Sequence, residues 1–292
     1  MDTVPVGGAP VTWPTMSGPS PAGEQYTHGH HPVIVASHAQ RSAANSAAYL
    51  LGHLTPGLRL LDGGCGPGSI TADLAAVVAP GEVVGIDNVA VVLAQAEELG
   101  RERGLSNVRY QDASIYALPF PDASFDVIHA HQVLQHLADP VAALAEMRRV
   151  VKPGGLVAAR DSDFGTMVHD PREPLLDRWL DLYHQVARSN GAEPDAGRRL
   201  LRWARAAGFV DVTATSTSWS YAEDASRLQW GELWAVRITE GAFAGQAVAA
   251  GLSSAAELAE IASAWRSWAR KPDGFFAFLH GEILARAPGA EP

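Results

Sequence analysis

An apolar segment that runs directly into a glycine-rich turn constrains this chain most. Residues 58–69 read Leu-Arg-Leu-Leu-Asp-Gly-Gly-Cys-Gly-Pro-Gly-Ser, and a helical pattern of apolar residues follows them. Glycines let the backbone approach a ligand closely, and the N-terminus of the following helix presents free N–H groups to it. The segment therefore predicts a strand–turn–helix unit that binds a nucleotide-like ligand.

The spacing within this turn departs from the fingerprint of dinucleotide-binding proteins, G-x-G-x-x-G/A. Here Gly64, Gly66 and Gly68 follow a G-x-G-x-G pattern, and Asp62 stands two residues before the first of them. A carboxylate at this position is poorly suited to a pyrophosphate. It suits a cation, held through water or as an adjacent ammonium.

Two further acids end the next two expected strands. Asp87 follows Val-Val-Gly-Ile and Asp112 follows Val-Arg-Tyr-Gln, so Asp62, Asp87 and Asp112 are each 25 residues apart, one for each strand–helix unit. Ligands of open parallel sheets bind beyond the carboxyl ends of the strands. Asp87 is placed to accept hydrogen bonds from ribose hydroxyls, and Asp112 from an adenine amino group.

Several short segments accompany these acids. They are residues 62–68, 84–87, 111–113, 118–120, 125–128, 133–140 (Val-Leu-Gln-His-Leu-Ala-Asp-Pro) and 152–155 (Lys-Pro-Gly-Gly). As a set they resemble the class I S-adenosylmethionine (SAM)-dependent methyltransferases, and most closely the ubiquinone/menaquinone-type branch that acts on small molecules. The resemblance covers residues 58–160 well and the C-terminal part loosely. It implies SAM as the cofactor.

The alternation of strand and helix patterns predicts an α/β fold, a Rossmann-like doubly wound sheet that is mostly parallel. The resemblance implies seven strands with an antiparallel last strand, and we place strands six and seven at about Asp211–Trp219 and Phe275–Ala287. Helical insertions at about 165–192 and 222–272 are expected to form a lid. The domain spans 25–292, preceded by a Pro/Gly-rich segment, 1–24, that we expect to be a mobile tail.

The resemblance also implies the cofactor-binding residues. These are Asp62, Gly63, Gly64, Gly66, Gly68, Asp87, Asn88, Asp112, Ala113 and His131. N-terminal residues of the family often fold over the cofactor, which suggests Tyr26 as a cover for its methionine end and Arg41 as the ligand of its carboxylate. A solvent-exposed polar segment is the competing interpretation of residues 26–41.

Histidines near the expected working edge of the sheet are the candidate general bases. His131 closes the fourth strand, and His169 lies at the first insertion. We name His131 as the first choice and His169 as the second, although a structural, hydrogen-bonded role is the competing interpretation for each. His136 belongs to a segment shared by relatives with different acceptors, which favours a cofactor-side or structural role.

Two groups of residues raise the question of a metal. His28, His30, His31 and His38 lie close in sequence, and Asp161, Asp163 and Asp170 follow the fifth strand. The histidines lack a cysteine or carboxylate at ligand spacing, and loop capping or contact with a polar acceptor explains the acids. We therefore predict no metal.

Composition excludes several classes of partner and location. A net charge of −10 argues against nucleic acid, and the single cysteine, Cys65, fits a reducing compartment and a turn filler rather than a nucleophile. The N-terminus shows no signal peptide and no segment reaches the length of a membrane span, so we expect a cytoplasmic protein without membrane contact. The expected partner is a small-molecule acceptor, and a homodimer is left open.

Tryptophans concentrate in the C-terminal part. Seven of the eight follow residue 178, and the pairs Trp230/Trp234 and Trp265/Trp268 each share one face of a helix. Core packing is one interpretation; a lining for a planar acceptor is the other.

We therefore predict SAM-dependent methyl transfer to a small aromatic or lipophilic metabolite at oxygen, nitrogen or carbon. The alternatives are a SAM-binding cyclase or decarboxylase on the same fold, and a non-catalytic SAM-binding partner subunit.

Overall fold

A seven-stranded mixed sheet organises the chain. The computed structural model describes residues 25–29 and 31–289, so the expected tail at 1–24 lies outside the described residues. The sheet order is β3-β2-β1-β4-β5-β7-β6. Its strands are β1 (Leu60–Gly63), β2 (Val83–Asp87), β3 (Val108–Asp112), β4 (Phe125–His131), β5 (Val151–Asp170), β6 (Asp211–Tyr221) and β7 (Phe275–Arg286). Strands β1 to β5 are parallel to one another, and β7 is antiparallel to both β5 and β6, which confirms the predicted fold class.

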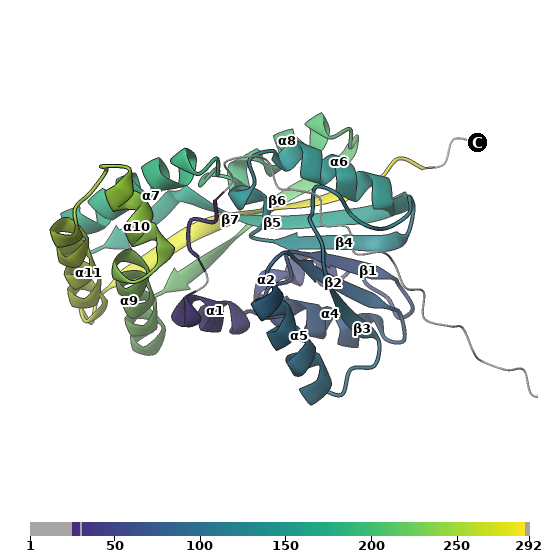
Figure 1. Ribbon diagram of the computed structural model, residues 1–292, viewed down its shortest axis with the longest axis horizontal. Helices are drawn as coiled ribbons and strands as arrows, with labels where there is room; N and C mark the ends of the chain where they lie inside the picture. Colours follow the sequence, from purple (N-terminus) through teal and green to yellow (C-terminus); the bar gives the residue numbers. More distant parts are fainter. Residues whose placement is uncertain (1–24, 30, 290–292) are drawn as a thin grey trace, which may run out of the picture.

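Helices cover both faces of this sheet. In Figure 1, α4 (Ser69–Val78) and α5 (Ala90–Glu102) lie below it, and α6 (Pro140–Val150) and α8 (Leu200–Ala206) lie above it. The buried side chains of α4 and β1 form one apolar cluster, whereas those of α6 and α8 form another with β4 and β5. The strands are thus buried on both faces, as parallel sheets require.

Strand β5 is much longer than the sequence pattern suggests. The apolar run at residues 156–159 predicts a short strand, but β5 continues to Asp170, and residues 165–170 of the expected helical insertion belong to it. The reason is tertiary: β7 pairs with β5 along its length, as far as Asp170 opposite Phe275. In Figure 1 this extension projects from the sheet toward the C-terminal helices.

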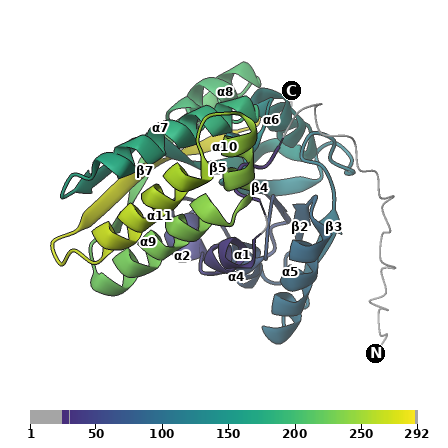
Figure 2. The same cartoon turned by 60° about the vertical axis from the view of Figure 1, so that its left-hand side comes forward.

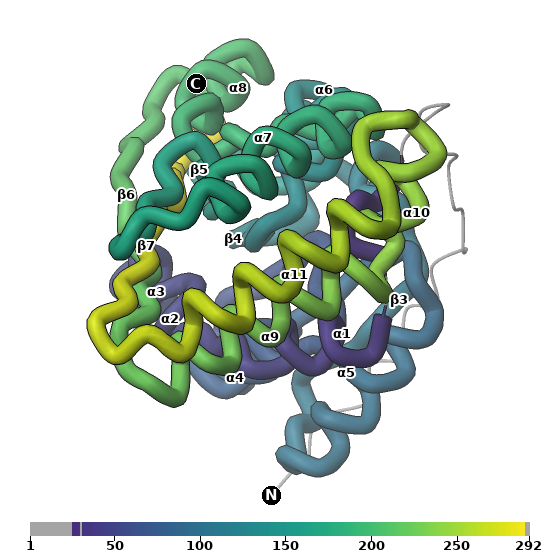
Figure 3. Tube along the Cα trace, turned by 90° about the vertical axis from the view of Figure 1, so that its left-hand side faces the viewer, coloured from purple at the N-terminus to yellow at the C-terminus, as the bar shows by residue number. Residues whose placement is uncertain are grey.

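The helical insertions gather around this extension. Helices α7 (Pro174–Ser189), α9 (Asp224–Thr239), α10 (Ala242–Ala249) and α11 (Ala255–Ala269) surround it in Figures 2 and 3. Their buried side chains form a separate cluster rich in aromatic residues, which we call the aromatic cap; its largest members include Trp179, Trp230, Trp234, Trp265, Trp268, Tyr183 and Phe276. Trp265 and Trp268 are therefore packing residues, whereas Trp230 and Trp234 pack here and also line the cavity described below.

Short helices connect the N-terminal segment to both halves. Helix α1 (Pro32–Ala39) lies beside α9, as Figure 3 shows, and α2 (Ala43–Ser46) packs against α4. The side chain of Ser42 caps the N-terminus of α2. Helix α3 (Ala48–Leu51) follows directly. Residues 31–51 thus bridge the sheet and the aromatic cap.

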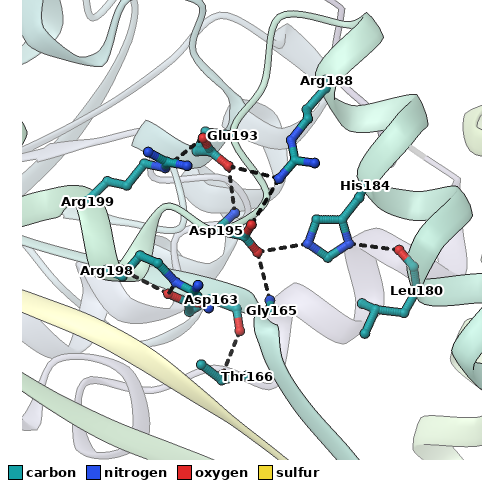
Figure 4. Close-up of polar contacts among 10 residues, drawn as sticks. All are labelled: Asp163, Gly165, Thr166, Leu180, His184, Arg188, Glu193, Asp195, Arg198 and Arg199. Atoms are coloured by element: carbon teal, nitrogen blue, oxygen red, sulfur yellow. Dashed lines mark hydrogen bonds and ion pairs between the residues drawn. The ribbon is translucent and has the colours of Figure 1, made fainter.

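A polar network fixes the start of the cap to the sheet (Figure 4). The Asp195 carboxylate accepts hydrogen bonds from the backbone N–H of Gly165 at 2.7 Å, His184 Nε2 at 2.8 Å and Arg188 Nη2 at 3.0 Å. Burial opposes ionisation of Asp195, but the hydrogen bond and charge of His184 hold the pKa of this carboxyl below its usual value. The network ties β5 to α7 and to the loop that precedes α8.

The described helices do not include one that is both long enough and apolar enough to cross a membrane.

Candidate active site

A cavity of about 920 Å³ opens between the carboxyl ends of β1, β2 and β4 and the aromatic cap. This volume lies within the range of small-molecule and cofactor sites. One end is lined by the glycine turn and strand ends, which we call the cofactor edge. The other end is lined by the cap and β6. Residues from the N-terminal segment, among them Tyr26 and Arg41, line it as well.

The glycine turn approaches the cavity through its backbone. Gly64 and Gly66 line the cavity, whereas Gly63 and Gly68 shape the turn behind it. Gly64 has a φ of +67°, and a Cβ there would lie 2.5 Å from Val133 Cγ2. Gly68 has a φ of +79° at the N-terminus of α4, where a Cβ would meet Ala96 at 2.6 Å. Both positions require glycine for conformation and for space.

Asp62 lines the cavity, but its carboxylate is already occupied within the protein. One oxygen accepts a hydrogen bond from Thr71 Oγ1 at 2.5 Å, and the other lies 2.7 Å from His129 Nδ1. His129 stands opposite Asp62 because β4 pairs with β1 in that register. Asp62 therefore has an internal role besides the cation-binding role expected of it: it ties β1, α4 and β4 together below the turn.

Asp87 ends β2 at the cavity wall. Its carboxylate accepts hydrogen bonds from the backbone N–H groups of Gly66 at 3.0 Å and Val89 at 3.1 Å, so it is held in place beside the turn. Asn88 and Ala113 also line the cavity. Asp112 does not; its side chain is exposed at the end of β3, and Ser114 lies in the wall instead.

Arg41 and Tyr26 lie in the cavity wall as the sequence suggests. Arg41 Nη2 donates to Gln132 Oε1 at 2.6 Å, which places the guanidinium beside the end of β4. Burial lowers the pKa of Arg41 to about 10, so the group stays charged at neutral pH. The ring of Tyr26 lies edge-on to His136, with 4.8 Å between the centroids. The N-terminal segment is thus part of the site.

His131 closes β4 inside this wall. Both of its ring nitrogens are buried and have no hydrogen-bond partner among the described residues. Burial, with the nearby charges of Arg41 and Arg160, lowers the pKa of His131 well below its usual value, so the imidazole is neutral. Next to it, Gln132 adopts a φ of +54° and also contacts His280 Nε2 at 2.9 Å.

The second candidate base does not reach the cavity. His169 lies at the far end of β5, where its Nε2 accepts a hydrogen bond from the backbone N–H of Glu173 at 3.1 Å, just before α7. The length of β5 carries it away from the strand ends. His136 does line the cavity, and burial lowers its pKa to about 3.

The described residues contain no group of three or more histidine, cysteine or acidic side chains that could hold a metal. Among the N-terminal histidines, His30 lies outside the described residues, and His28 is buried with its Nε2 3.0 Å from the Tyr183 hydroxyl. Asp161 and Asp163 are buried and bonded within the protein, Asp161 to the backbone N–H of Gln135 and Asp163 to Arg198.

Sequence reasoning missed Arg237, a cavity residue on α9. Arg237 is 6% exposed, and its guanidinium lies 4.9 Å from the centre of the Trp234 ring. A signal was present: Arg237 follows Trp230 and Trp234 by seven and three residues, so it shares their helix face. A charged residue on an apolar helix face marks either an ion pair or a site. Gln132 and Tyr221, also in the wall, carried no such signal.

Comparison with known proteins agrees with this geometry. Residues 61–159 match the family model described as a methyltransferase domain. An uncharacterized methyltransferase of Schizosaccharomyces pombe is 33% identical over 267 residues, covering 89% of this chain and 95% of that protein. A ubiquinone/menaquinone biosynthesis C-methyltransferase of Shewanella halifaxensis is 32% identical, covering 55% of this chain and 70% of its own.

Solved structures show the same architecture. The crystal structure of the cyclase SpnF matches with a TM-score of 0.52 and 27% identity, over 84% of this chain and 80% of that one. The YcgJ protein of Bacillus subtilis matches with a TM-score of 0.53 and 19% identity, over 83% and 98% of the two chains, which bears on the fold alone. The chain belongs to the class I SAM-dependent methyltransferases, and ubiquinone/menaquinone-type enzymes are among its relatives.

Proposed function

We propose that this protein transfers a methyl group from SAM to a small organic acceptor held under the aromatic cap. The observation that carries the proposal is the continuity of the cavity, which joins the cofactor edge to the aromatic cap. A cofactor and an acceptor held side by side in one cavity meet the geometric requirement of a direct displacement.

Residues at the cofactor edge fit SAM. In this proposal Asp87 and Asn88 bind the ribose hydroxyls, and Gly64 and Gly66 present their backbone to the nucleoside from the cavity wall. Ala113 and Ser114 line the wall where an adenine would lie, while Asp112 stands outside it. Arg41 supplies a fixed cation for the methionine carboxylate, and Tyr26 covers that end.

When bound, SAM supplies an electrophilic methyl group that an acceptor atom attacks in line with the carbon–sulfur bond. The cap excludes water from the reacting atoms and holds the acceptor in position, which can account for about 7–11 kcal/mol of the barrier in well-oriented reactions.

His131 is the proposed proton acceptor. Its neutral imidazole takes the proton that an oxygen or nitrogen acceptor loses as it is methylated. A base with so low a pKa is weak, but the attacked atom becomes strongly acidic once it carries the new methyl group, so a weak base suffices. Arg41 and Arg160, whose charges lower this pKa, also keep the ring neutral before the reaction.

Calorimetric titration with SAM and with S-adenosylhomocysteine (SAH) tests the cofactor site. Wild-type protein should bind both, and Asp87→Ala should weaken binding by roughly 10–100-fold, since hydrogen bonds to a charged group contribute about 1.5–3 kcal/mol. Asp122→Ala is the matched control, because Asp122 is an exposed carboxylate that pairs with Arg149. Absence of binding to wild-type protein would refute the proposal.

The likeness to the cyclase SpnF favours one second candidate, a SAM-bound enzyme that rearranges its substrate without methyl transfer. The products of the reaction distinguish a methyltransferase from such a cyclase. Methyl transfer releases one SAH for each turnover, whereas a cyclase converts its substrate with no SAH formed.

A further inference from the structure

Arg237 is a buried cation whose counter-ion the protein does not supply. Its Nη2 donates to Ser37 Oγ at 3.3 Å, its guanidinium packs on Trp234, and its Nε is buried without a hydrogen-bond partner among the described residues. No ion pair connects it to a carboxylate within the described part of the chain. The side chain lines the cavity.

The titratable neighbours of Arg237 do not neutralise it. Tyr26, Tyr183 and Tyr221 are the groups that act on it most strongly, and burial raises the pKa of each of these phenols. They are therefore uncharged at neutral pH. Glu232, the acidic residue of α9 that lines the cavity, already pairs with Arg266 at 2.8 Å. A guanidinium does not deprotonate in proteins, so a positive charge remains in the cavity.

An uncompensated buried charge costs several kcal/mol unless a ligand completes it. Arg41 is the other cavity arginine without an ion pair in the described structure. It lies at the cofactor edge, bonded to Gln132 at the end of β4, and the proposed function assigns it to the methionine carboxylate. Arg237 comes from the cap, and Tyr26 lies near both arginines. Two cations therefore face this part of the cavity, and because the proposed function gives the single methionine carboxylate to Arg41, Arg237 is left to bind an anion of the other ligand.

The surroundings of Arg237 define the rest of that ligand. The cap end of the cavity is lined by apolar and aromatic side chains: Phe164, Met167, Trp230, Leu233, Trp234 and Phe278. A single guanidinium binds a carboxylate through two parallel hydrogen bonds, and its one positive charge balances the one negative charge of that group. The wall therefore fits an apolar body that ends in one negative charge.

We propose that the acceptor is an organic acid with an aromatic or aliphatic body, whose carboxylate is bound by Arg237. This inference rests on the proposed function for the acceptor's role, but the anion site is testable without turnover. It narrows the lipophilic metabolite expected from the sequence to one that carries a carboxylate.

Matched acid and amide pairs test the site directly. We would titrate benzoate against benzamide, 2-naphthoate against 2-naphthamide and octanoate against octanamide, by calorimetry at saturating SAH. In at least one pair, the acid should bind about tenfold or more tightly than the amide, which corresponds to about 1.4 kcal/mol. Benzyl phosphate serves as the dianionic probe and should bind more weakly than the best carboxylate.

Variants locate the preference. Arg237→Gln should remove the preference for the acid and leave SAH affinity unchanged, and Arg237→Lys should keep part of it because lysine provides charge without the planar fork. Arg270→Gln is the control, since Arg270 is an exposed arginine at the end of α11. Arg41→Gln should weaken SAH binding and keep the acid preference, measured without SAH.

The outcomes separate this inference from the proposed function. Equal binding of acid and amide in every pair, no binding of any acid, tighter binding of the phosphate, or an unchanged preference in Arg237→Gln would overturn the anion site. If the acid preference were lost in Arg41→Gln but kept in Arg237→Gln, the anion would bind to Arg41 and the assignment to Arg237 would be wrong. Failure of wild-type protein to bind SAH, with the acid preference intact, would instead refute the cofactor assignment.

Discussion

The cofactor edge and the aromatic cap place their functional residues by different means. At the cofactor edge, Asp87 and the glycine turn stand where strands end, so backbone topology positions them. In the cap, Arg237 is positioned by packing: its guanidinium lies over the Trp234 ring. The ring centroids of Trp179 and Trp265 lie 4.3 and 6.2 Å from that of Trp234. We therefore expect the first arrangement to tolerate side-chain substitutions that would disrupt the second.

This difference matters for function because the two regions bear on different ligands. The cofactor edge belongs to a sheet whose clusters are shared by five parallel strands and the helices on both faces. The cap is a separate cluster built on the extension of β5 and β7. Damage to the cap should therefore reach the acceptor end of the cavity before the cofactor end.

Trp265→Ala is the change that should separate the regions most. Trp265 is fully buried in the cap, and truncation of a buried tryptophan costs about 3–5 kcal/mol of unfolding free energy. Hydrogen exchange should show that amides of α9 and α11 lose protection while those of β1 and β2 keep it, because the two clusters are distinct. SAH affinity should stay within about threefold of wild type.

Trp203→Ala is the matched substitution on the sheet side, since Trp203 packs from α8 into the cluster of β4 and β5. It should lower stability without a selective loss of protection in the cap. If Trp265→Ala exposes the amides of β1 and β2 equally, the cap and the cofactor edge form one cooperative unit and the comparison fails.

Asp195→Asn tests the polar network that joins the regions. The amide keeps one acceptor but loses the charge that His184 and Arg188 contact, so we expect a loss of about 1–3 kcal/mol in the free energy of unfolding, measured with urea. Asp122→Asn changes an exposed partner of Arg149 and should cost less than about 1 kcal/mol. Equal losses of stability in the two variants would show that the Asp195 network contributes no more than an exposed ion pair.

A smaller effect concerns pH. His136 packs between Tyr26 and His28, and burial keeps its imidazole neutral in the folded protein, with a pKa of about 3. Unfolded, it binds a proton below about pH 6.5, so the unfolded chain holds more protons than the folded one in the window between these values. Stability should therefore fall as the pH falls from 7.5 to 5.5.

His136→Asn should reduce this fall by about 1 kcal/mol, since a histidine with so low a folded pKa contributes at most about 1.4 kcal/mol for each pH unit below 6.5. Urea titrations of both proteins at pH 7.5 and 5.5 provide the comparison. Identical pH dependence in the two proteins would show that the pKa of His136 is the same in the folded and the unfolded state.

The cofactor edge was largely readable from the sequence. A strand pattern followed by glycines can form few structures, and acids at the ends of successive parallel strands meet at one edge of a sheet. The hydrogen-bond partners of these acids could not be predicted from the sequence. The short-range pattern does not show that His129 faces Asp62, because their pairing depends on β1 and β4 being neighbours in the sheet.

For the cap, the sequence showed helical segments rich in tryptophan but not how they pack. Helix periodicity predicted the insertions and the shared faces of the tryptophan pairs, but the length of β5 depends on its pairing with β7, more than a hundred residues later. That pairing carries His169 away from the cavity and leaves His131 in it. A local pattern contains no information about such long-range pairing.

The sequence by itself determined the fold class, the glycine turn and the positions of Asp62 and Asp87, because conformational preference and strand–helix periodicity are local properties. Tertiary structure alone decided that Asp62 is bonded internally, that Arg41 lies beside Gln132, and that Arg237 reaches the same cavity from the cap. Charge compensation in a buried site depends on which groups approach through space. The shared cavity of Arg41 and Arg237 therefore exists only in the folded chain and could not be predicted from their positions in the sequence.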